Sequence, residues 1–273
     1  MKISFTTLSC PDWPWERILD EASRLGYDGI EIRGVEGEMY LNRARPFLPH
    51  NLSHTKRLLK ERGLAICCLD TSCVFHDRST YSTYLQEGKD AVDLAYQMEV
   101  PYIRVFGNNV PEGQDESEII DMVADALSEL GVYAKDKGVS VLIETHGDFA
   151  RTDRLLKVLE KVDCDSVGVL WDINHPYKTF KEPVEQTYAR LKGYIKHTHI
   201  KDSLGWGRDA RLCMVGKGDV PVTRCVELLS QNGYEGWLSL EWEKKWHPEL
   251  EEPKIALEEY IRYAKKYFAN LKS

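Results

Sequence analysis

The sequence lacks the features that mark several large classes of protein. It has no apolar run close to the roughly 20 residues that a membrane-spanning helix needs. The first apolar stretch breaks off at Cys10-Pro11-Asp12, too early for the apolar region of a signal peptide. Positive charge is not in excess, since 36 Lys and Arg face 44 Asp and Glu, whereas nucleic-acid binders usually carry a concentrated basic surface. We therefore expect a cytoplasmic protein with no membrane or nucleic-acid partner.

Paired cysteines are also missing. The seven cysteines are odd in number and scattered, and none of them forms a Cys-x-x-Cys pair. In a chain of 273 residues this spacing argues against a disulfide framework and against a cysteine-based zinc site. We interpret most of the cysteines as small apolar residues of the core.

The sequence does contain a regular alternation of short apolar runs with segments of helical periodicity. The expected strands are residues 3–8, 29–33, 65–70, 102–107, 140–146, 168–172, 195–200 and 237–242. Several of them are apolar nearly throughout, which is typical of parallel strands covered on both faces. Between strands, residues 119–133 carry apolar side chains at helical spacing, and Asp115 is placed to cap the start of that helix.

Eight such units predict an α/β protein whose residues 1–273 form a single (β/α)8 TIM barrel domain. A doubly wound open sheet is the alternative, but that fold usually has a glycine-rich phosphate loop after its first strand. Here the first strand leads into Ser9-Cys10-Pro11-Asp12-Trp13 instead. The segment Gly-Tyr-Asp-Gly-Ile at 26–30 is echoed by Gly-Tyr-Glu-Gly-Trp at 233–237, which suits a closed ring of repeated units.

Four consecutive expected strands finish with ionisable side chains. These are Glu144, then Asp172, then His197 and His199, and finally Glu241 and Glu243. The carboxyl ends of barrel strands meet at one rim, where crowded carboxylates repel one another unless a cation lies among them. Three carboxylates and one imidazole suit a divalent metal ion. Spacing alone leaves open which histidine and which of the last two glutamates take part.

Six motifs together carry a resemblance to a known superfamily. They are Gly-Tyr-Asp-Gly-Ile-Glu-Ile-Arg (26–33), Ile-Arg-Val-Phe-Gly (103–107), Ile-Glu-Thr-His (143–146), Trp-Asp-Ile-Asn-His (171–175), His-Thr-His-Ile-Lys-Asp (197–202) and Leu-Glu-Trp-Glu (240–243). The chain resembles the xylose-isomerase-like TIM-barrel superfamily and, within it, the sugar phosphate isomerase/epimerase group. The likeness spans nearly the whole chain and specifies the superfamily better than the substrate.

The resemblance implies the ligands of one divalent metal ion, with Mn²⁺ favoured and Mg²⁺, Co²⁺ or Zn²⁺ as alternatives. The implied ligands are Glu144, Asp172, His199 and Glu241. The resemblance thus favours His199 over His197 and Glu241 over Glu243. It also implies that Glu144 and Glu241 are the catalytic acid and base.

Three further residues are candidates for contact with the substrate. The resemblance places His175 there, and we extend the hypothesis to His146 and Lys201. A structural role remains open for His146, as does a helix-capping or rim role for His175. For Lys201 the alternative is an ion pair with Asp202 at the rim.

The implied activity is that of a metal-dependent sugar isomerase or epimerase, which removes a proton next to a carbonyl through a metal-stabilised enediolate. The alternative is a dehydratase or lyase acting on an inosose or 3-keto sugar, which shares the first step. Several ketose 3-epimerases have another glutamate soon after the first ligand, and here residues 146–151 contain none. We expect a small-molecule sugar as substrate, and a homo-oligomer is compatible with the sequence.

Three secondary expectations concern residues near the rim. Arg104 lies within an apolar run and is expected to form a structural ion pair with an acidic partner, for which Glu31 is a candidate, because an unpaired buried charge is costly. The segment Gly-Lys-Gly-Asp at 216–219 would offer backbone N–H groups to an anion such as phosphate. Five aromatic residues are expected in or near loops around the mouth: Trp13, Trp15, Phe75, Trp206 and Trp246.

Overall fold

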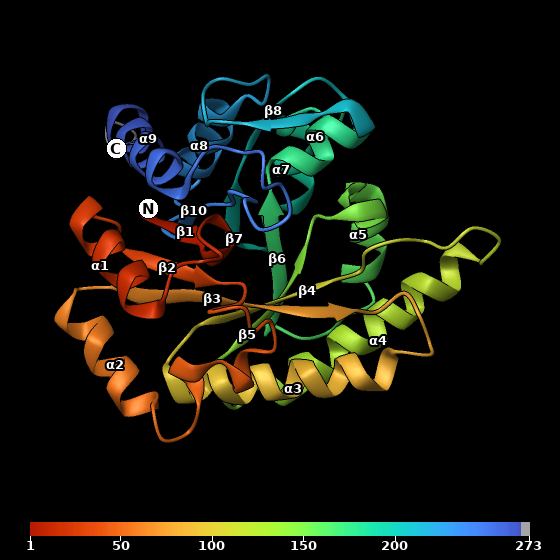
Figure 1. Cartoon of the computed structure of the whole chain (residues 1–273). Helices are drawn as coiled ribbons and strands as arrows, with labels where there is room; N and C mark the ends of the chain where they lie inside the picture. Colours follow the sequence, from red (N-terminus) through yellow and green to blue (C-terminus); the bar gives the residue numbers. More distant parts are fainter. Residues whose placement is uncertain (269–273) are drawn as a thin grey trace.

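A ring of eight parallel strands forms the centre of the molecule (Figure 1). The computed structural model describes residues 1–268. The barrel strands are β1 (Lys2–Thr6), β2 (Gly29–Ile32), β3 (Ala65–Val74), β4 (Tyr102–Phe106), β5 (Ser140–Glu144), β6 (Val167–Asp172), β7 (Ile195–Ile200) and β10 (Trp237–Leu240). They close in the order β1-β10-β7-β6-β5-β4-β3-β2, and this confirms the predicted (β/α)8 fold class.

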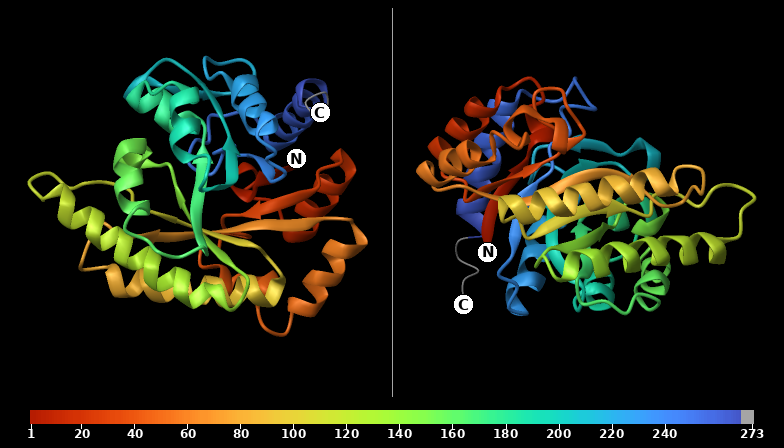
Figure 2. Two further views of the ribbon diagram at one scale, coloured as in Figure 1. Left: turned by 180° about the vertical axis from the view of Figure 1, so that it is seen from behind. Right: turned by 90° about the horizontal axis from the view of Figure 1, so that it is seen from below.

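Helices surround the barrel, and α3 and α4 lie side by side along one flank (Figure 2). The α-helices are α1 (Trp15–Leu25), α2 (Leu52–Glu61), α3 (Tyr81–Met98), α4 (Glu116–Lys135), α5 (Thr152–Leu159), α6 (Asn174–Phe180), α7 (Val184–Leu191), α8 (Val222–Gln231) and α9 (Pro253–Tyr267). Short 3₁₀ turns are η1 (Thr7–Ser9), η2 (Leu41–Arg43), η3 (Arg45–Phe47), η4 (Gly147–Ala150) and η5 (Gly207–Asp209). Within residues 1–268, none of the helices has the length and apolar character needed to cross a membrane.

The core fills the space between the strands and the helices. Val141, Leu142 and Ile143 of β5 are completely buried, as expected for a strand that is covered on both faces. Helix α4 buries the predicted apolar face against the barrel. The carboxylate of Asp115 accepts a hydrogen bond from the backbone N–H of Ser117 at 2.8 Å, so this residue is the N-cap that the sequence indicated.

The strand ends differ from the predicted ones in physically simple ways. β1 stops at Thr6, because the Thr6 hydroxyl accepts the N–H of Leu8 and turns the chain into η1. β3 runs on to Val74 through an irregularity that still pairs it with β4. After β7 the chain forms an antiparallel hairpin outside the barrel, from β8 (Asp202–Leu204) and β9 (Arg211–Cys213), which the sequence analysis missed.

The strand register brings the polar strand ends to a single rim. Glu144 of β5 pairs with Leu170 of β6, and Asp172 at the end of β6 pairs with His199 of β7. On the other side of β7, Glu241 follows β10 directly, and its N–H donates to the carbonyl of Ile200 at 3.1 Å. Parallel pairing therefore carries these side chains to the same height.

We predict that Gly29→Ala destabilises the barrel by about 1–3 kcal/mol, because the added methyl group has no space. A Cβ at this position would lie 2.5 Å from the carbonyl oxygen of Ala65 and 2.7 Å from the ring of Trp237. Gly193→Ala is the matched control, since nothing lies within 4 Å of its Cβ position. In urea unfolding, the free energy of unfolding of Gly193→Ala should stay within about 0.5 kcal/mol of the wild type. Equal free energies of unfolding for Gly29→Ala and Gly193→Ala would contradict the prediction.

Candidate metal centre

Four polar side chains converge where the carboxyl ends of β5, β6, β7 and β10 meet. Glu144, Asp172, His199 and Glu241 each offer one ligand atom, and these atoms all lie within 4.8 Å of one another. All four residues are buried. The structure thus selects His199 rather than His197, and Glu241 rather than Glu243, as members of this cluster.

Each member of the cluster has one polar atom that is left without a hydrogen bond within the described residues. These atoms are Glu144 Oε2, Asp172 Oδ2, His199 Nδ1 and Glu241 Oε2. Arg104 and Lys201 approach the three carboxylate atoms as ion pairs but do not align as hydrogen-bond donors. Buried polar atoms normally have partners, so this donor set fits a divalent cation, which would satisfy one atom from each residue.

Asp172 divides its two carboxylate oxygens between two tasks. Oδ1 accepts the backbone N–H groups of Asn174 at 2.7 Å and His175 at 3.2 Å, and so caps the start of α6. Oδ2 is left to face the cluster. Burial raises the pKa of Asp172 to about 7, an effect that the ammonium of Lys201 opposes and the nearby carboxylates reinforce. A bound cation would favour the ionised form.

Glu31 orients the imidazole of His199 from below. Its two carboxylate oxygens lie 3.0 Å from Nε2 of His199 and 3.0 Å from Nε2 of His197. Burial opposes the charge on Glu31, but the two imidazoles hold the pKa of its carboxyl well below the usual range. An ionised carboxylate can only accept, so Nε2 of His199 donates to Glu31, and Nδ1 is the ring nitrogen that faces Glu144 and Glu241.

Arg104 pairs with Asp70 and Glu144, so the expected buried ion pair is present, but the candidate partner Glu31 is wrong. Nε of Arg104 lies 3.0 Å from Glu144 Oε2, and Nη2 lies 3.4 Å from Asp70 Oδ2. Burial raises the pKa of Glu144, but Arg104 and His199 outweigh it and hold that pKa below its usual value. Glu31 is not the partner because β3 stands between β2 and β4, so Asp70 is the neighbour of Arg104.

Lys201 reaches inward to the cluster and not to Asp202, so the alternative of a Lys201–Asp202 ion pair is wrong. Its Nζ lies 3.0 Å from Asp172 Oδ2 and 2.5 Å from Glu243 Oε1, and it also pairs with Glu241. Only 2% of the Lys201 side chain is exposed. Its positive charge therefore offsets part of the negative charge that three carboxylates bring to the rim.

His175 and His146 form an aromatic edge beside the cluster. Nε2 of His175 lies 3.5 Å from Asp172 Oδ2 and 3.4 Å from Nζ of Lys201. The ring of His146 contacts that of His175 at 4.8 Å and that of Phe106 at 4.7 Å. The three proposed substrate contacts, His146, His175 and Lys201, therefore lie together. Asp148, two residues after His146, does not join this group, because its carboxylate accepts the backbone N–H of Val110 at 2.8 Å.

The loop at 216–219 is not free to bind an anion, and the phosphate interpretation is therefore wrong. The carboxylate of Asp202 already accepts the backbone N–H groups of Gly216, Gly218 and Val220 at 2.9, 2.9 and 3.1 Å. It also accepts that of Ser203 at 2.9 Å. An internal carboxylate thus takes the donors that a phosphate would need.

The aromatic residues expected around the mouth divide into two groups. Trp13, Trp15 and Phe75 are buried and pack in the core, whereas Trp206 and Trp246 are about half exposed.

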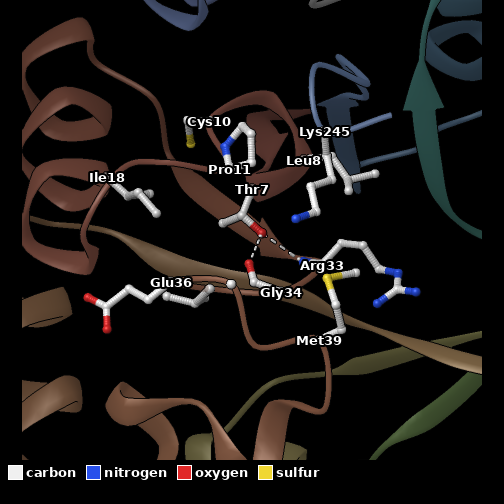
Figure 3. Close-up of a pocket in the computed structure, with 12 residues that line it drawn as sticks. Thr7, Leu8, Cys10, Pro11, Ile18, Arg33, Gly34, Glu36, Met39 and Lys245 are labelled. Atoms are coloured by element: carbon white, nitrogen blue, oxygen red, sulfur yellow. Dashed lines mark hydrogen bonds between the residues drawn. The ribbon is translucent and has the colours of Figure 1, made fainter. Parts of the chain in front are cut away.

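Figure 3 shows the cavity at the ends of β1 and β2, where the Thr7 hydroxyl donates to the carbonyl of Gly34 and accepts the N–H of Arg33. Its volume is about 10 Å³, which is at most enough for one water molecule.

The sequence analysis named the four clustered residues but missed the supporting shell. Glu31 was only a candidate partner of Arg104, Asp70 was not considered, and His197 was only an alternative ligand. All three are completely buried. The sequence did contain a signal for these residues, because each is an ionisable side chain within an otherwise apolar strand. A buried ionisable side chain needs a polar or charged partner. Side chains alternate in direction along a strand, and this alternation could have shown which of them point into the barrel.

The model of a protein family described as a xylose isomerase-like TIM barrel matches residues 19–267. The chain is 26% identical over 266 residues to the inosose dehydratase of Clostridium botulinum (strain Alaska E43 / Type E3), covering 84% of this chain and 82% of that protein. It is also 26% identical over 257 residues to the fructoselysine 3-epimerase of Shigella flexneri, covering 88% and 90%.

A solved structure shares the same fold. The crystal structure of the IOLI protein with a bound zinc atom superposes with a TM-score of 0.79 at 20% sequence identity, covering 100% of this chain and 98% of that chain. At this identity the likeness shows the fold alone.

We predict that Arg104→Met destabilises the protein by roughly 3–5 kcal/mol, because it leaves Glu144 as a buried charge without its cationic partner. Arg24→Met is the control, since Arg24 forms two ion pairs on the surface, with Glu21 and Glu258. Surface pairs contribute little, so the control should unfold close to the wild type in urea. A similar loss of unfolding free energy in both variants would show that the buried ion pairs of Arg104 stabilise the protein no more than the surface pairs of Arg24 do.

Proposed function

Because the chain belongs to the xylose isomerase-like TIM barrel family, we propose that it is a divalent-metal-dependent enzyme that removes a proton next to the carbonyl group of a sugar. Return of the proton would make it an isomerase or epimerase. The observation that carries the proposal is the convergence of Glu144, Asp172, His199 and Glu241, with ligand atoms within 4.8 Å, at the rim where barrels of this kind hold their active sites.

We assign these four residues as the metal ligands. The support is the set of four buried atoms without hydrogen bonds, one from each residue. A bound divalent ion, Mn²⁺ being our first choice, would supply Lewis acidity that polarises the substrate carbonyl and stabilises negative charge on its oxygens. The relative that contains zinc supports a divalent ion without identifying the native one.

Glu144 and Glu241 are our candidates for moving the proton. They come from β5 and β10, which β6 and β7 separate in the barrel, so they flank the centre of the site. Ion pairs with Arg104 and Lys201 favour the ionised form of each. One ionised carboxylate accepts the substrate proton, and the other, after taking a proton from solvent, donates one to the opposite face of the same carbon. We assign His146, His175 and Lys201 to the substrate side of this centre.

A dehydratase is the second candidate, and one observation favours it directly. The relatives include an inosose dehydratase as well as a fructoselysine 3-epimerase, both at 26% identity. The two reactions share the removal of a proton next to a carbonyl and differ in whether a hydroxyl group then leaves. The absence of the extra glutamate from residues 146–151 also weakens a 3-epimerase assignment.

We predict that the wild-type protein with Mn²⁺ exchanges a carbon-bound hydrogen of a ketose, inosose or 3-keto sugar with solvent D2O, as seen by NMR. Glu144→Gln and Glu241→Gln should each lower the exchange rate by about 10²–10⁴-fold at saturating metal, because a general base is lost. An NMR-visible epimer would indicate an epimerase, and an ultraviolet-absorbing enone would indicate a dehydratase. Normal exchange in Glu144→Gln would refute the assigned role of Glu144.

We predict that Glu31→Gln weakens Mn²⁺ binding by about 10–100-fold, because the imidazole of His199 loses the acceptor that orients it. Isothermal titration of the purified protein with Mn²⁺ gives the affinity. Glu61→Gln is the control, since Glu61 is an exposed residue of α2. An unchanged affinity in a correctly folded Glu31→Gln protein would remove Glu31 from the metal-binding apparatus.

A further inference from the structure

A cleft of about 610 Å³ opens beside the candidate metal centre. Three of its lining residues, His175, Lys201 and Glu243, are those that also contact the cluster or each other there. The cleft then runs outward between α6, the β8–β9 hairpin and the loop that follows β10. In Figure 1, β8 and α6 lie together on one side of the barrel.

The cleft is larger than a single sugar ring requires. Its volume lies in the middle of the range of about 300–1,000 Å³ that accommodates drug-sized ligands. A monosaccharide whose carbonyl lies at the cluster would occupy the inner end, near His175 and Lys201. The outer part, lined by residues such as Thr179, Arg211 and Leu250, would then stay unfilled.

The hairpin side of the cleft is braced. The Asp202 carboxylate holds the hairpin to residues 216–220 through backbone N–H groups. The hydroxyl of Ser203 donates to the side chain of Asn174 in α6 at 2.6 Å. Lys178 is buried, pairs with Asp219 at 3.2 Å and lies 4.6 Å from the ring of Trp206. These contacts hold this wall against α6.

The opposite wall is also braced. The indole N–H of Trp242 donates to the carbonyl of Glu251 at 3.0 Å, and the ammonium of Lys244 donates to the carbonyl of Pro248 at 2.8 Å. Both walls of the cleft therefore exist before a ligand binds. A preformed cleft spends little binding free energy on ordering the protein.

The lining of the outer part indicates the chemistry of what it holds. Over the whole lining, three cations (Lys178, Lys201 and Arg211) face three carboxylates (Glu243, Glu249 and Glu251), so neither sign of charge prevails. The inner cations Lys178 and Lys201 are each already paired with carboxylates. Leu212 and Leu250 lie among these polar groups. Hydrogen-bonding groups mixed with small apolar surfaces and no net charge suit a neutral, hydroxylated ring.

We propose that the substrate is a two-ring saccharide, whose keto-sugar unit reaches the metal centre while a glycosyl unit occupies the outer cleft. The inference rests on the proposed function for the placement of the keto-sugar unit. It goes beyond that function because it names the size and the neutral character of the rest of the substrate.

The test compares free ketohexoses with ketose disaccharides. Fructose, tagatose and psicose represent the first group, and leucrose, maltulose and palatinose present a glucosyl unit at three different positions of the ketose. Hydrogen exchange in D2O with Mn²⁺ measures turnover, and saturation-transfer NMR measures binding independently of turnover. We expect at least one disaccharide to exceed every free ketose by about tenfold or more in kcat/KM and in affinity.

Two variants of the hairpin localise the effect. Leu212→Trp places a large ring in the outer cleft and should remove the preference for two rings, while turnover of free ketoses stays within about threefold of the wild type. Leu204→Trp is the matched control, because Leu204 is an exposed residue of the same hairpin outside the cleft lining. Ala210→Trp provides a second filling variant if Leu212→Trp does not fold.

The outcomes separate the two proposals. Free ketoses that bind and react as well as every disaccharide would overturn the two-ring substrate and leave the proposed function intact. Binding of a disaccharide that Leu212→Trp abolishes, without exchange of any sugar, would support the cleft assignment and overturn the proposed function. Neither binding nor exchange of any sugar would overturn both.

Discussion

The structure depends on the balance of charge in the closed interior of the barrel. Five carboxylates lie at or just below the rim: Glu31, Asp70, Glu144, Asp172 and Glu241. All are buried, and burial alone would drive them toward the neutral form. Arg104, Lys201 and the two imidazoles of the His-x-His pair hold most of them ionised through direct contacts. Removing Arg104 or Lys201 would leave Glu144 or Glu241 as a buried carboxylate without its cation.

The buried charged side chains form two layers, and the upper layer is the cluster of Glu144, Asp172, His199 and Glu241 at the rim. In the lower layer, Glu31 joins His197 and His199, and Arg104 joins Asp70 to Glu144. The contact from Glu31 occupies Nε2 of His199, whereas Arg104 approaches the same Glu144 oxygen that lacks a hydrogen bond. With Nε2 held by Glu31, Nδ1 of His199 is the ring nitrogen that faces Glu144 and Glu241. The orientation of His199 in the candidate metal centre is therefore set by Glu31, which is not one of the four assigned ligands.

The fold and the ionisable strand ends could be predicted from the sequence by short-range rules, whereas the choice of His199 over His197 and of Glu241 over Glu243 came from the family resemblance. Apolar runs separated by helical segments specify the barrel, and a residue at the end of a parallel strand lies at the rim whatever its neighbours are. Partners of buried charges could not be predicted in this way. Arg104 had two acidic candidates within reach, and only the strand order made Asp70 its neighbour and left Glu31 to the histidines. The β8–β9 hairpin also escaped prediction, because strands of three residues are too short to show a periodicity.

The barrel rim carries the four clustered residues of the candidate site, and the β8–β9 hairpin lines the cleft beside them. The rim is built from strand ends that the closed sheet fixes, so its geometry varies little without loss of the fold. The hairpin hangs outside the barrel and is tied to it by Asp202, Ser203 and Lys178, none of which belongs to the cluster of four ligands. Changes in the hairpin can therefore alter the length and polarity of the cleft while the rim stays intact. The stretch of chain between β7 and α8 is therefore one element, together with α6 and the loop after β10, that shapes the cleft without contributing to the cluster of four.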